Sequence, residues 1–312
     1  MSGGRGYLTL GFGRPAYRRL AQGMGRSLAL HAPDLPRAVV TDVLDEDWSM
    51  FDHVIPLRED LSRDLVHKIH LDDYTPFDDT MFLDSDTFAT RSLDDVWRQT
   101  DRDFGLIGKP AYEGRWWGGD IAVIREICGI EGPLPRFNTG VMRWKRGETA
   151  HGVFAAARDL WDRYDELGLG EFRAGLHRAD EPILAIAMAW AGLECVPDDG
   201  SIMVEPAAMI GRPVLDLHRQ RSRIVLPWVD ARPAVFHFCG SLRKGGLYRR
   251  EAAYLRWRGR IGAGPAWAAT RVVFAPLVAL DTQLTWRVLG LVQRTVRRLR
   301  GARDEAPKNV HV

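Results

Sequence analysis

The sequence predicts an α/β fold in which helices flank a mostly parallel central sheet. The first observation is that short apolar runs alternate with longer amphipathic segments over residues 7–84, which is the pattern of βαβ units. The second is composition: 46% of the residues are hydrophobic and 10% are aromatic, so the chain can bury a large core. At 312 residues the chain is long for one domain and short for two full ones.

Each expected element follows from the type and spacing of its residues. Short runs of aliphatic, β-branched and aromatic residues predict strands. These runs are residues 7–12, 37–42, 53–57, 80–84, 136–144 and 233–241. Apolar residues three and four positions apart predict helices. These segments are residues 14–31, 61–71, 147–167 and 179–193.

Local signals refine three of these segments. Pro15 stands near the start of the first helix, where its fixed φ angle is favourable. Ser62 is the expected N-cap of the second helix. Residues 112–120, YEGRWWGGD, predict a glycine-rich loop with exposed aromatic side chains.

Cysteine usage and the N-terminal residues indicate a reducing, cytoplasmic setting. Cys128, Cys195 and Cys239 are widely spaced and form no CxxC pair, so we expect neither a zinc knuckle nor a disulfide framework. The first residues, MSGGRGYLTLGFG, lack the basic and apolar regions of a signal peptide. The longest apolar run, residues 183–192, is too short to span a bilayer as a helix.

Charge divides the chain into an acidic body and a basic extension. Residues 1–242 hold 28 basic and 37 acidic residues, a balance of −9, whereas residues 243–303 hold 14 basic and 2 acidic residues. We therefore expect a catalytic domain over residues 1–242 and a basic helical extension over residues 243–312. No stacking-aromatic or zinc module accompanies the basic residues, so nucleic acid is not an expected partner.

The extension contains one amphipathic segment. Apolar residues three and four positions apart over residues 267–301 predict a helix with one apolar face, interrupted at Pro276 and Asp281. Such a helix can lie in a membrane interface, pack on the body of the protein or form a dimer seam. We expect the first of these, with the protein peripheral on the inner face of an anionic membrane.

The segment MFLDSDTFAT, residues 81–90, is the strongest chemical signal. Asp84 and Asp86 follow an apolar strand and are two residues apart, so their carboxylates point the same way and repel each other. A divalent cation between them would remove this cost. Phosphatases of the haloacid-dehalogenase type also carry two aspartates after a strand, but Phe88 stands where that pattern has a small residue.

Four segments in a fixed order resemble one enzyme family. They are LDSD at 83–86, FNTG at 137–140, ADEP at 179–182 and HFCGSLRK at 237–244. This set resembles the GT-A glycosyltransferases, most closely the glycogenin-like family-eight group. The resemblance covers about residues 7–244. It implies a GT-A fold and a nucleotide-sugar donor, with retention of configuration.

The resemblance also implies roles for individual residues. The expected metal ligands are Asp84, Asp86 and His237, and the expected ion is Mn²⁺, or Mg²⁺. Two carboxylates with an imidazole suit Mn²⁺ better than Ca²⁺. The expected donor-binding residues are Tyr17, Lys68, Thr139, Gly140, Gly240, Arg243 and Lys244. The expected catalytic residues are Asp180, Glu181 and Asn138.

Two departures from the family pattern stand out. The family's phosphate-binding lysine falls on Arg243 here, with Lys244 next, and the family's Pro-Trp is replaced by two glycines. The family's glutamine after the aspartate is Glu181. Both acidic residues of ADEP also have a plain explanation, since carboxylates at a helix start complement the helix dipole.

The sequence therefore predicts a metal-dependent hexosyltransferase. The expected donor is a UDP-hexose, and the expected acceptor is a glycan or a lipid-linked molecule. Two alternatives remain open. A nucleotidyltransferase of related fold would need a basic phosphate loop near the N-terminus, of which GFGRPAYRR, residues 11–19, is a faint version. A non-catalytic sugar-nucleotide-binding protein is opposed by the intact aspartates and His237.

Overall fold

The computed structural model describes residues 3–280 except 171–177, 198, 205 and 207–208. The predicted amphipathic segment 267–301 therefore lies outside the described residues from residue 281 onward.

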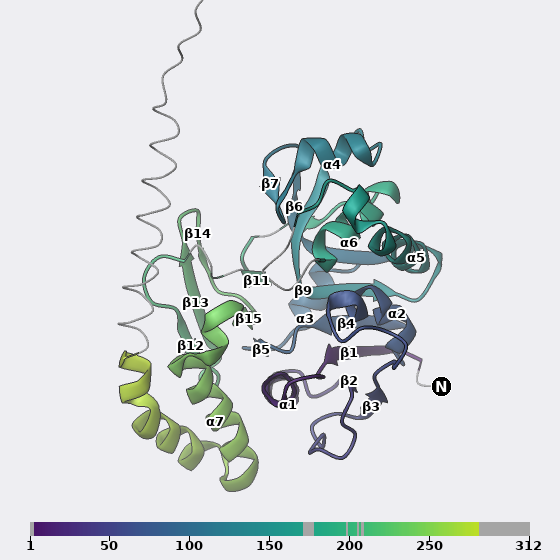
Figure 1. The fold of residues 1–312 in the computed structure, drawn as a ribbon. Helices are drawn as coiled ribbons and strands as arrows, with labels where there is room; N and C mark the ends of the chain where they lie inside the picture. Colours follow the sequence, from purple (N-terminus) through teal and green to yellow (C-terminus); the bar gives the residue numbers. More distant parts are fainter. Residues whose placement is uncertain (1–2, 171–177, 198, 205, 207–208, 281–312) are drawn as a thin grey trace, which may run out of the picture.

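A seven-stranded sheet forms the centre of the molecule, in the order β10-β6-β9-β4-β1-β2-β3 (Figure 1). Its strands are β1 (Arg5–Leu10), β2 (Arg37–Thr41), β3 (His53–Pro56), β4 (Asp79–Leu83), β6 (Phe104–Ala111), β9 (Leu134–Lys145) and β10 (Val196–Pro197). Neighbouring strands are parallel except that β9 runs antiparallel to β4 and β6. The predicted mostly parallel sheet is confirmed.

Helices cover both faces of this sheet. They are α1 (Pro15–His31), α2 (Leu71–Tyr74), α3 (Asp94–Gln99), α4 (Ile121–Ile127), α5 (Glu148–Asp162) and α6 (Asp180–Trp190), whereas α7 (Gly246–Ile261) packs elsewhere. Consecutive strand residues point to opposite faces. Accordingly, Tyr7 and Met81 pack with α1 and α3, whereas Leu8 and Phe82 pack with α5 and α6. Both faces are apolar, as a parallel sheet covered on two sides requires.

A second region lies beside the central sheet and brings late segments to the metal-ligand candidates. It contains the sheets β11-β15-β5 and β12-β13-β14, with α7 packed against them (Figure 1). The strands are β5 (Thr87–Ala89), β11 (Met203–Val204), β12 (Val214–Asp216), β13 (Arg221–Leu226), β14 (Val229–Ala231) and β15 (Val235–His237). The sequence did not indicate β12–β14, whereas α7 lies within the predicted helical extension. The predicted boundary at residue 243 falls in the 3-10 turn η4 (Gly240–Lys244), which leads into α7, and stays a prediction.

Segment 61–71 differs from the predicted single α-helix. Leu65–His70 form a 3-10 turn, η1, and α2 follows directly. The N-cap is Asp64 and not Ser62, because the Asp64 carboxylate accepts the backbone N–H two residues further on at 2.8 Å. The Ser62 hydroxyl instead donates to Asp64 at 2.9 Å. A carboxylate is a stronger hydrogen-bond acceptor than a hydroxyl, so Asp64 and not Ser62 is the N-cap.

Residues 112–120 also differ from the predicted loop. They contain a small antiparallel hairpin made of β7 (Arg115–Trp116) and β8 (Gly119–Asp120). Trp116 is buried, with its ring edge-on to Phe137 at a centroid distance of 5.9 Å. The Trp116 side chain is therefore part of the core, whereas Tyr112 is exposed as predicted.

The last described helix, Ala263–Leu280, follows α7. It has a mean hydropathy of 1.3 over its 18 residues, and by length and composition it could cross a membrane; 11% of it is buried. Its first half is anchored, since Ala266 and Thr270 are buried. Near its end the backbone approaches α7 so closely that a Cβ on Gly246 would lie 2.7 Å from the Leu277 carbonyl oxygen. The helix thus packs against the start of α7.

Candidate functional site

Asp84 and Asp86 lie where β4 ends and the short turn to β5 begins. The Asp84 N–H donates to the Gly140 carbonyl at 3.0 Å, which continues the pairing of β4 with β9 by one residue. The Thr87 N–H and hydroxyl both donate to the Asp84 carbonyl, at 3.1 and 2.7 Å. These bonds fix a tight turn that keeps both carboxylates on one side.

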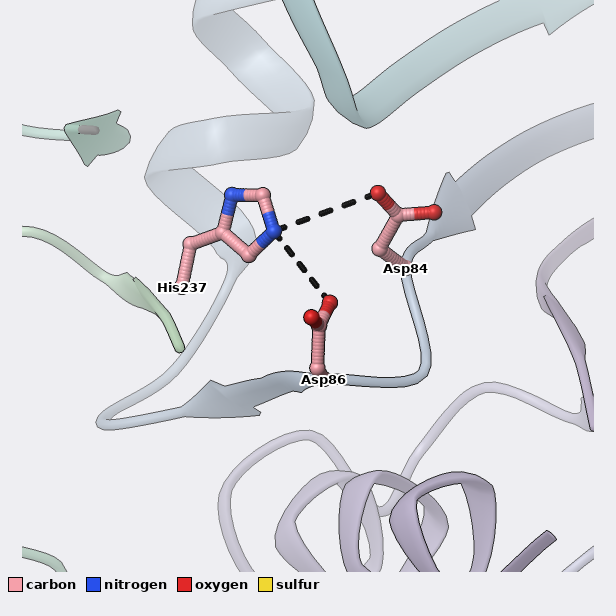
Figure 2. A group of neighbouring side chains, drawn as sticks. All are labelled: Asp84, Asp86 and His237. Atoms are coloured by element: carbon pink, nitrogen blue, oxygen red, sulfur yellow. Dashed lines mark ion pairs between the residues drawn. The ribbon is translucent and has the colours of Figure 1, made fainter. Parts of the chain in front are cut away.

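His237 reaches the same place from β15. This strand is antiparallel to β5 with His237 opposite Thr87, and the Phe238 N–H donates to the Asp86 carbonyl at 2.8 Å. Figure 2 shows the resulting cluster, with His237 Nε2 3.2 Å from Asp86 Oδ1 and 4.0 Å from Asp84 Oδ2. Strand register therefore joins residues about 150 positions apart.

The three side chains fit a divalent cation. Their ligand atoms lie within 4.8 Å of one another. Neighbouring ligands of a cation bound at about 2.1 Å are roughly 3 Å apart, so small side-chain movements would suffice. Two carboxylate oxygens and one imidazole nitrogen suit Mn²⁺. Buried His237 Nδ1 has no hydrogen-bond partner within the described residues. An unpaired buried polar atom costs about 1–3 kcal/mol, which indicates that stability alone does not explain this cluster.

The two carboxylates have opposite pKa shifts. Burial raises the pKa of Asp84, although Lys68 opposes the shift. Burial also acts to raise the pKa of Asp86, but His237 and Arg243 outweigh it and lower that pKa to about 2. Burial would lower the pKa of His237, and the carboxylate of Asp86 reverses this and raises it. Both shifts favour an ion pair between His237 and Asp86 in the metal-free chain.

A second network connects Asp84 with the start of α6. Lys68 Nζ lies 2.8 Å from Asp84 Oδ1, 3.0 Å from the Thr139 hydroxyl and 3.6 Å from Asp180 Oδ2. The Thr139 hydroxyl donates to Asp180 Oδ2 at 2.7 Å, and its N–H donates to Glu181 Oε1 at 3.4 Å. Burial would lower the pKa of Lys68, but Asp180 and Asp84 raise it, so the ammonium keeps its charge.

A cavity of about 550 Å³ opens above these groups. Five predicted residues line it, namely Tyr17, Lys68, Asp84, Asp86 and Arg243. The Arg243 guanidinium lies 5.2 Å from the centroid of the Tyr17 ring and 3.4 Å from Asp86 Oδ2. The cavity thus has a partly exposed aromatic ring at one side and the carboxylate pair at the other.

Other predicted residues shape the site from behind. Asn138 Oδ1 accepts the Gly140 N–H at 2.9 Å. A Cβ on Gly140 would lie 2.9 Å from Met203 Sδ and 3.1 Å from His237 Cε1, so glycine permits the close approach of His237. Gly240 has a φ of 64°, which favours glycine at the turn after β15. Lys244 does not line this cavity; it faces a neighbouring one.

Several lining residues were missed by sequence reasoning. They are Leu10, Phe12, Arg14, Arg63, Asp64, Leu65 and Ser85. Phe12 and Arg14 lie in GFGRPAYRR, which the sequence indicated only as a faint phosphate loop, and Arg14 directly precedes the first helix, where an anion would meet the helix N-terminus. Nothing in the sequence around Arg63 distinguishes it from an ordinary surface arginine.

No family model and no curated protein matches the chain. Solved structures similar to it include glycosyltransferases. GlyE of Streptococcus pneumoniae TIGR4 has 17% identity and a TM-score of 0.41, over 62% of this chain and 45% of that one. The galactosyltransferase LgtC, solved with donor and acceptor sugar analogues, has 17% identity and a TM-score of 0.48, over 91% and 99%.

An active-site mutant of LgtC has 18% identity and a TM-score of 0.45, over 75% of this chain and 87% of that one. The match to GlyE is partial by comparison, since this chain spans less than half the length of GlyE. Because each TM-score is below 0.5, we base the functional proposal on the residues of the site.

Proposed function

We propose that this protein is a metal-dependent glycosyltransferase that moves a hexose from a UDP-linked donor to a glycan or lipid-linked acceptor, with retention of configuration. The observation that carries the proposal is the cluster of Asp84, Asp86 and His237 beside a cavity that also contains Tyr17 and Lys68. A nucleotide diphosphate needs a flat surface for its base and positive charge for its phosphates, and this cavity offers both.

Different residues of the cavity bind different parts of the donor. The Tyr17 ring stacks on the base, and Arg243, which already contacts that ring, turns its guanidinium toward a phosphate. Lys68 adds a buried positive charge next to Asp84. Mn²⁺ or Mg²⁺ held by Asp84, Asp86 and His237 would supply the charge that stabilises the departing diphosphate.

The start of α6 acts on the sugar. Asp180 and Glu181 are both buried and both contact Thr139, so their carboxylates are held at fixed positions behind the metal ligands. There they orient the sugar hydroxyls and stabilise positive charge that develops on the ring in the transition state. Asn138, two residues before Gly140, supplies an amide for the same sugar.

We also propose a peripheral position at an anionic membrane, on its cytoplasmic face. Support comes from the helix Ala263–Leu280, whose side chains Val272 and Val273 are 76% and 56% exposed. The basic residues of the extension would strengthen attachment, at about 1 kcal/mol for each cation near the surface.

A thermal-shift panel tests the catalytic part of the proposal. UDP-glucose, UDP-galactose and UDP-N-acetylglucosamine are each added with and without Mn²⁺, with ADP-glucose and GDP-mannose as controls for the base. We expect stabilisation by at least one UDP-sugar only when Mn²⁺ is present, and release of UDP when a sugar acceptor is supplied. Equal shifts with and without Mn²⁺, or no shift with any nucleotide sugar, would contradict the proposal.

A further inference from the structure

A second cavity, of about 510 Å³, adjoins the donor cavity. We name it the α1–α7 cavity, because α1, α7 and the following helix enclose it. Its lining residues are Arg14, Ala16, Tyr17, Arg19, Leu20, Arg243, Lys244, Tyr248, Arg249, Ala252, Ala253, Arg256 and Phe274. Arg14, Tyr17 and Arg243 line both cavities, so the two meet along the first turn of α1.

The charge of the α1–α7 cavity is entirely positive. Six cations line it and no acidic residue does. Arg243 pairs with Asp86. The remaining five, Arg14, Arg19, Lys244, Arg249 and Arg256, form no ion pair with any side chain in the described part of the chain. Among the described arginines outside this cavity a majority pair with carboxylates, and others, such as Arg136 and Arg212, do not. All five are exposed, so solvent screens part of their mutual repulsion, and an anion in the cavity would remove the remainder.

Tyr248 gives a second, independent indication of a ligand. It is 8% exposed and lines the cavity, and its ring is stacked on Phe88 at 4.9 Å, which fixes its position. Its hydroxyl makes no hydrogen bond to the part of the chain that the structure describes. Burial raises the pKa of Tyr248 above its ordinary value, so the hydroxyl keeps its proton and can donate to an anionic oxygen.

The cavity is also apolar on one side. Leu20, Ala252 and Ala253 line it from α1 and α7, and Phe274 from the last helix. On either side of Phe274 that helix exposes Val273 and Leu277, which are 56% and 43% accessible. A ligand that fits must therefore combine an anionic group with an apolar part. Phosphate attached to acyl or prenyl chains has this combination.

We propose that the α1–α7 cavity binds the phosphate group of an anionic membrane lipid, whose apolar chains lie along the helix Ala263–Leu280. This inference rests on the membrane part of the proposed function and deepens it, because it names a specific lipid-binding site. It also sets the orientation, since the donor cavity would open next to the membrane surface.

Vesicle co-sedimentation of the full chain tests the proposal. The probes are phosphatidylcholine vesicles with and without phosphatidic acid, at 0.15 M salt. The double variant Arg249→Gln/Arg256→Gln should bind the phosphatidic-acid vesicles at least tenfold more weakly than the wild type. The control variant Arg136→Gln/Arg212→Gln removes the same charge from exposed arginines elsewhere and should stay within twofold. Equal losses in both variants, or no binding by the wild type, would overturn the proposal.

Two further measurements distinguish a lipid phosphate from a free anion, and failure of the lipid proposal from failure of the catalytic proposal. Tyr248→Phe should weaken binding of dihexanoyl phosphatidic acid severalfold by calorimetry, and the wild type should bind this lipid at least tenfold more tightly than inorganic pyrophosphate. Equal affinity would indicate a simple anion site and overturn the lipid assignment. UDP affinity with Mn²⁺ should be unchanged in Arg249→Gln/Arg256→Gln, because neither residue lines the donor cavity. Failure of the wild type to bind UDP would contradict the catalytic proposal alone.

Discussion

Charged side chains are buried at both ends of the two paired strands β4 and β9, but only at one end are all of their buried polar atoms hydrogen-bonded within the described residues. At one end Arg143, which is fully buried, donates to both carboxylate oxygens of Asp79 at 2.8 and 2.7 Å and to Asp101 at 2.8 Å. Its guanidinium also lies 4.9 Å from the Trp97 ring centroid. Charge and hydrogen bonding are satisfied there by the protein itself.

At the other end, where β4 reaches Asp84, hydrogen bonding of the buried polar groups is incomplete. His237 keeps an unpaired buried Nδ1, and Asp84 and Asp86 face a cavity although Lys68, His237 and Arg243 contact them. The same strands therefore hold a closed network that stabilises the fold and an open network that suits a ligand. Burial and charge alone do not distinguish the two; the completeness of pairing does.

The largest expected effect tests the closed network. Arg143→Met removes the fully buried guanidinium from Asp79, whose side chain is 13% exposed and keeps only the exposed Arg5 as a partner. Breaking a buried ion pair by removing one member costs about 3–5 kcal/mol, and Arg5 places the expected loss near the lower value. Urea unfolding should show this loss as a lower midpoint. Arg223→Met is the control, since it removes an arginine from an exposed pair with Asp230 and should leave the midpoint unchanged. Similar losses in both variants would show that the Arg143 network is not special.

The next effect concerns Asp180 at the open end. Asp180→Asn should lower turnover about 100-fold, or about 2.7 kcal/mol, while KM for the UDP-sugar changes less than twofold, because Asp180 is proposed to act on the sugar. Glu181→Gln should behave in the same way. Asp94→Asn is the matched control, since Asp94 is an exposed carboxylate in the first turn of α3. If all three variants keep full turnover, the acidic residues of α6 serve only the helix dipole.

A third effect comes from His31, a buried imidazole that the fold keeps neutral. Burial and nearby Arg258 lower its pKa from 6.5 to about 4, although it stands at a helix C-terminus. Below pH 6.5 the unfolded chain takes up a proton that the folded chain refuses, so stability is complete above that pH and falls as pH decreases toward 4. The loss at pH 5 should be about 2 kcal/mol.

Urea unfolding at pH 7 and pH 5 measures this loss. His31→Gln should remove about that much of the pH dependence, whereas an unchanged slope would mean that other groups cause it.

The smallest effect tests how tightly the open end is built. In Gly140→Ala the new methyl group meets Met203 Sδ, which can yield, and the His237 ring, so we expect about 1 kcal/mol of lost stability and severalfold weaker Mn²⁺ binding. Gly152→Ala in α5 meets nothing within 4 Å and should raise stability by about 0.5–1 kcal/mol. Unaltered Mn²⁺ affinity in Gly140→Ala would show that His237 does not need its present position.

The sequence predicted the parts of this site that depend on local pattern. Apolar runs located β1, β2, β3 and β4, and the position of Asp84 at a strand end followed from them. The approach of His237 to Asp86 could not be derived from spacing, because it depends on the register between β5 and β15, which are far apart in the chain. Only the order of the motifs pointed to it.

Arg243 and Lys244 show a finer limit. The sequence predicted both as phosphate ligands, but they lie in a 3-10 turn, where consecutive side chains point about 120° apart. Arg243 consequently reaches the donor cavity, while Lys244 faces only the α1–α7 cavity. The prediction of a single α-helix over residues 61–71 was wrong because apolar spacing does not distinguish a 3-10 turn from an α-helix over so few residues.

Calorimetric titration of UDP with and without Mn²⁺ tests the open-network interpretation most directly. The wild type should bind UDP much more tightly with Mn²⁺, and Asp84→Ala and Asp86→Ala should each weaken that binding at least 100-fold. Their free energies of unfolding in urea should stay within about 1 kcal/mol of the wild-type value, because neither carboxylate belongs to a closed network. Unchanged Mn²⁺-dependent UDP affinity in both variants, or unfolding of both, would contradict the assignment of these residues to a metal site.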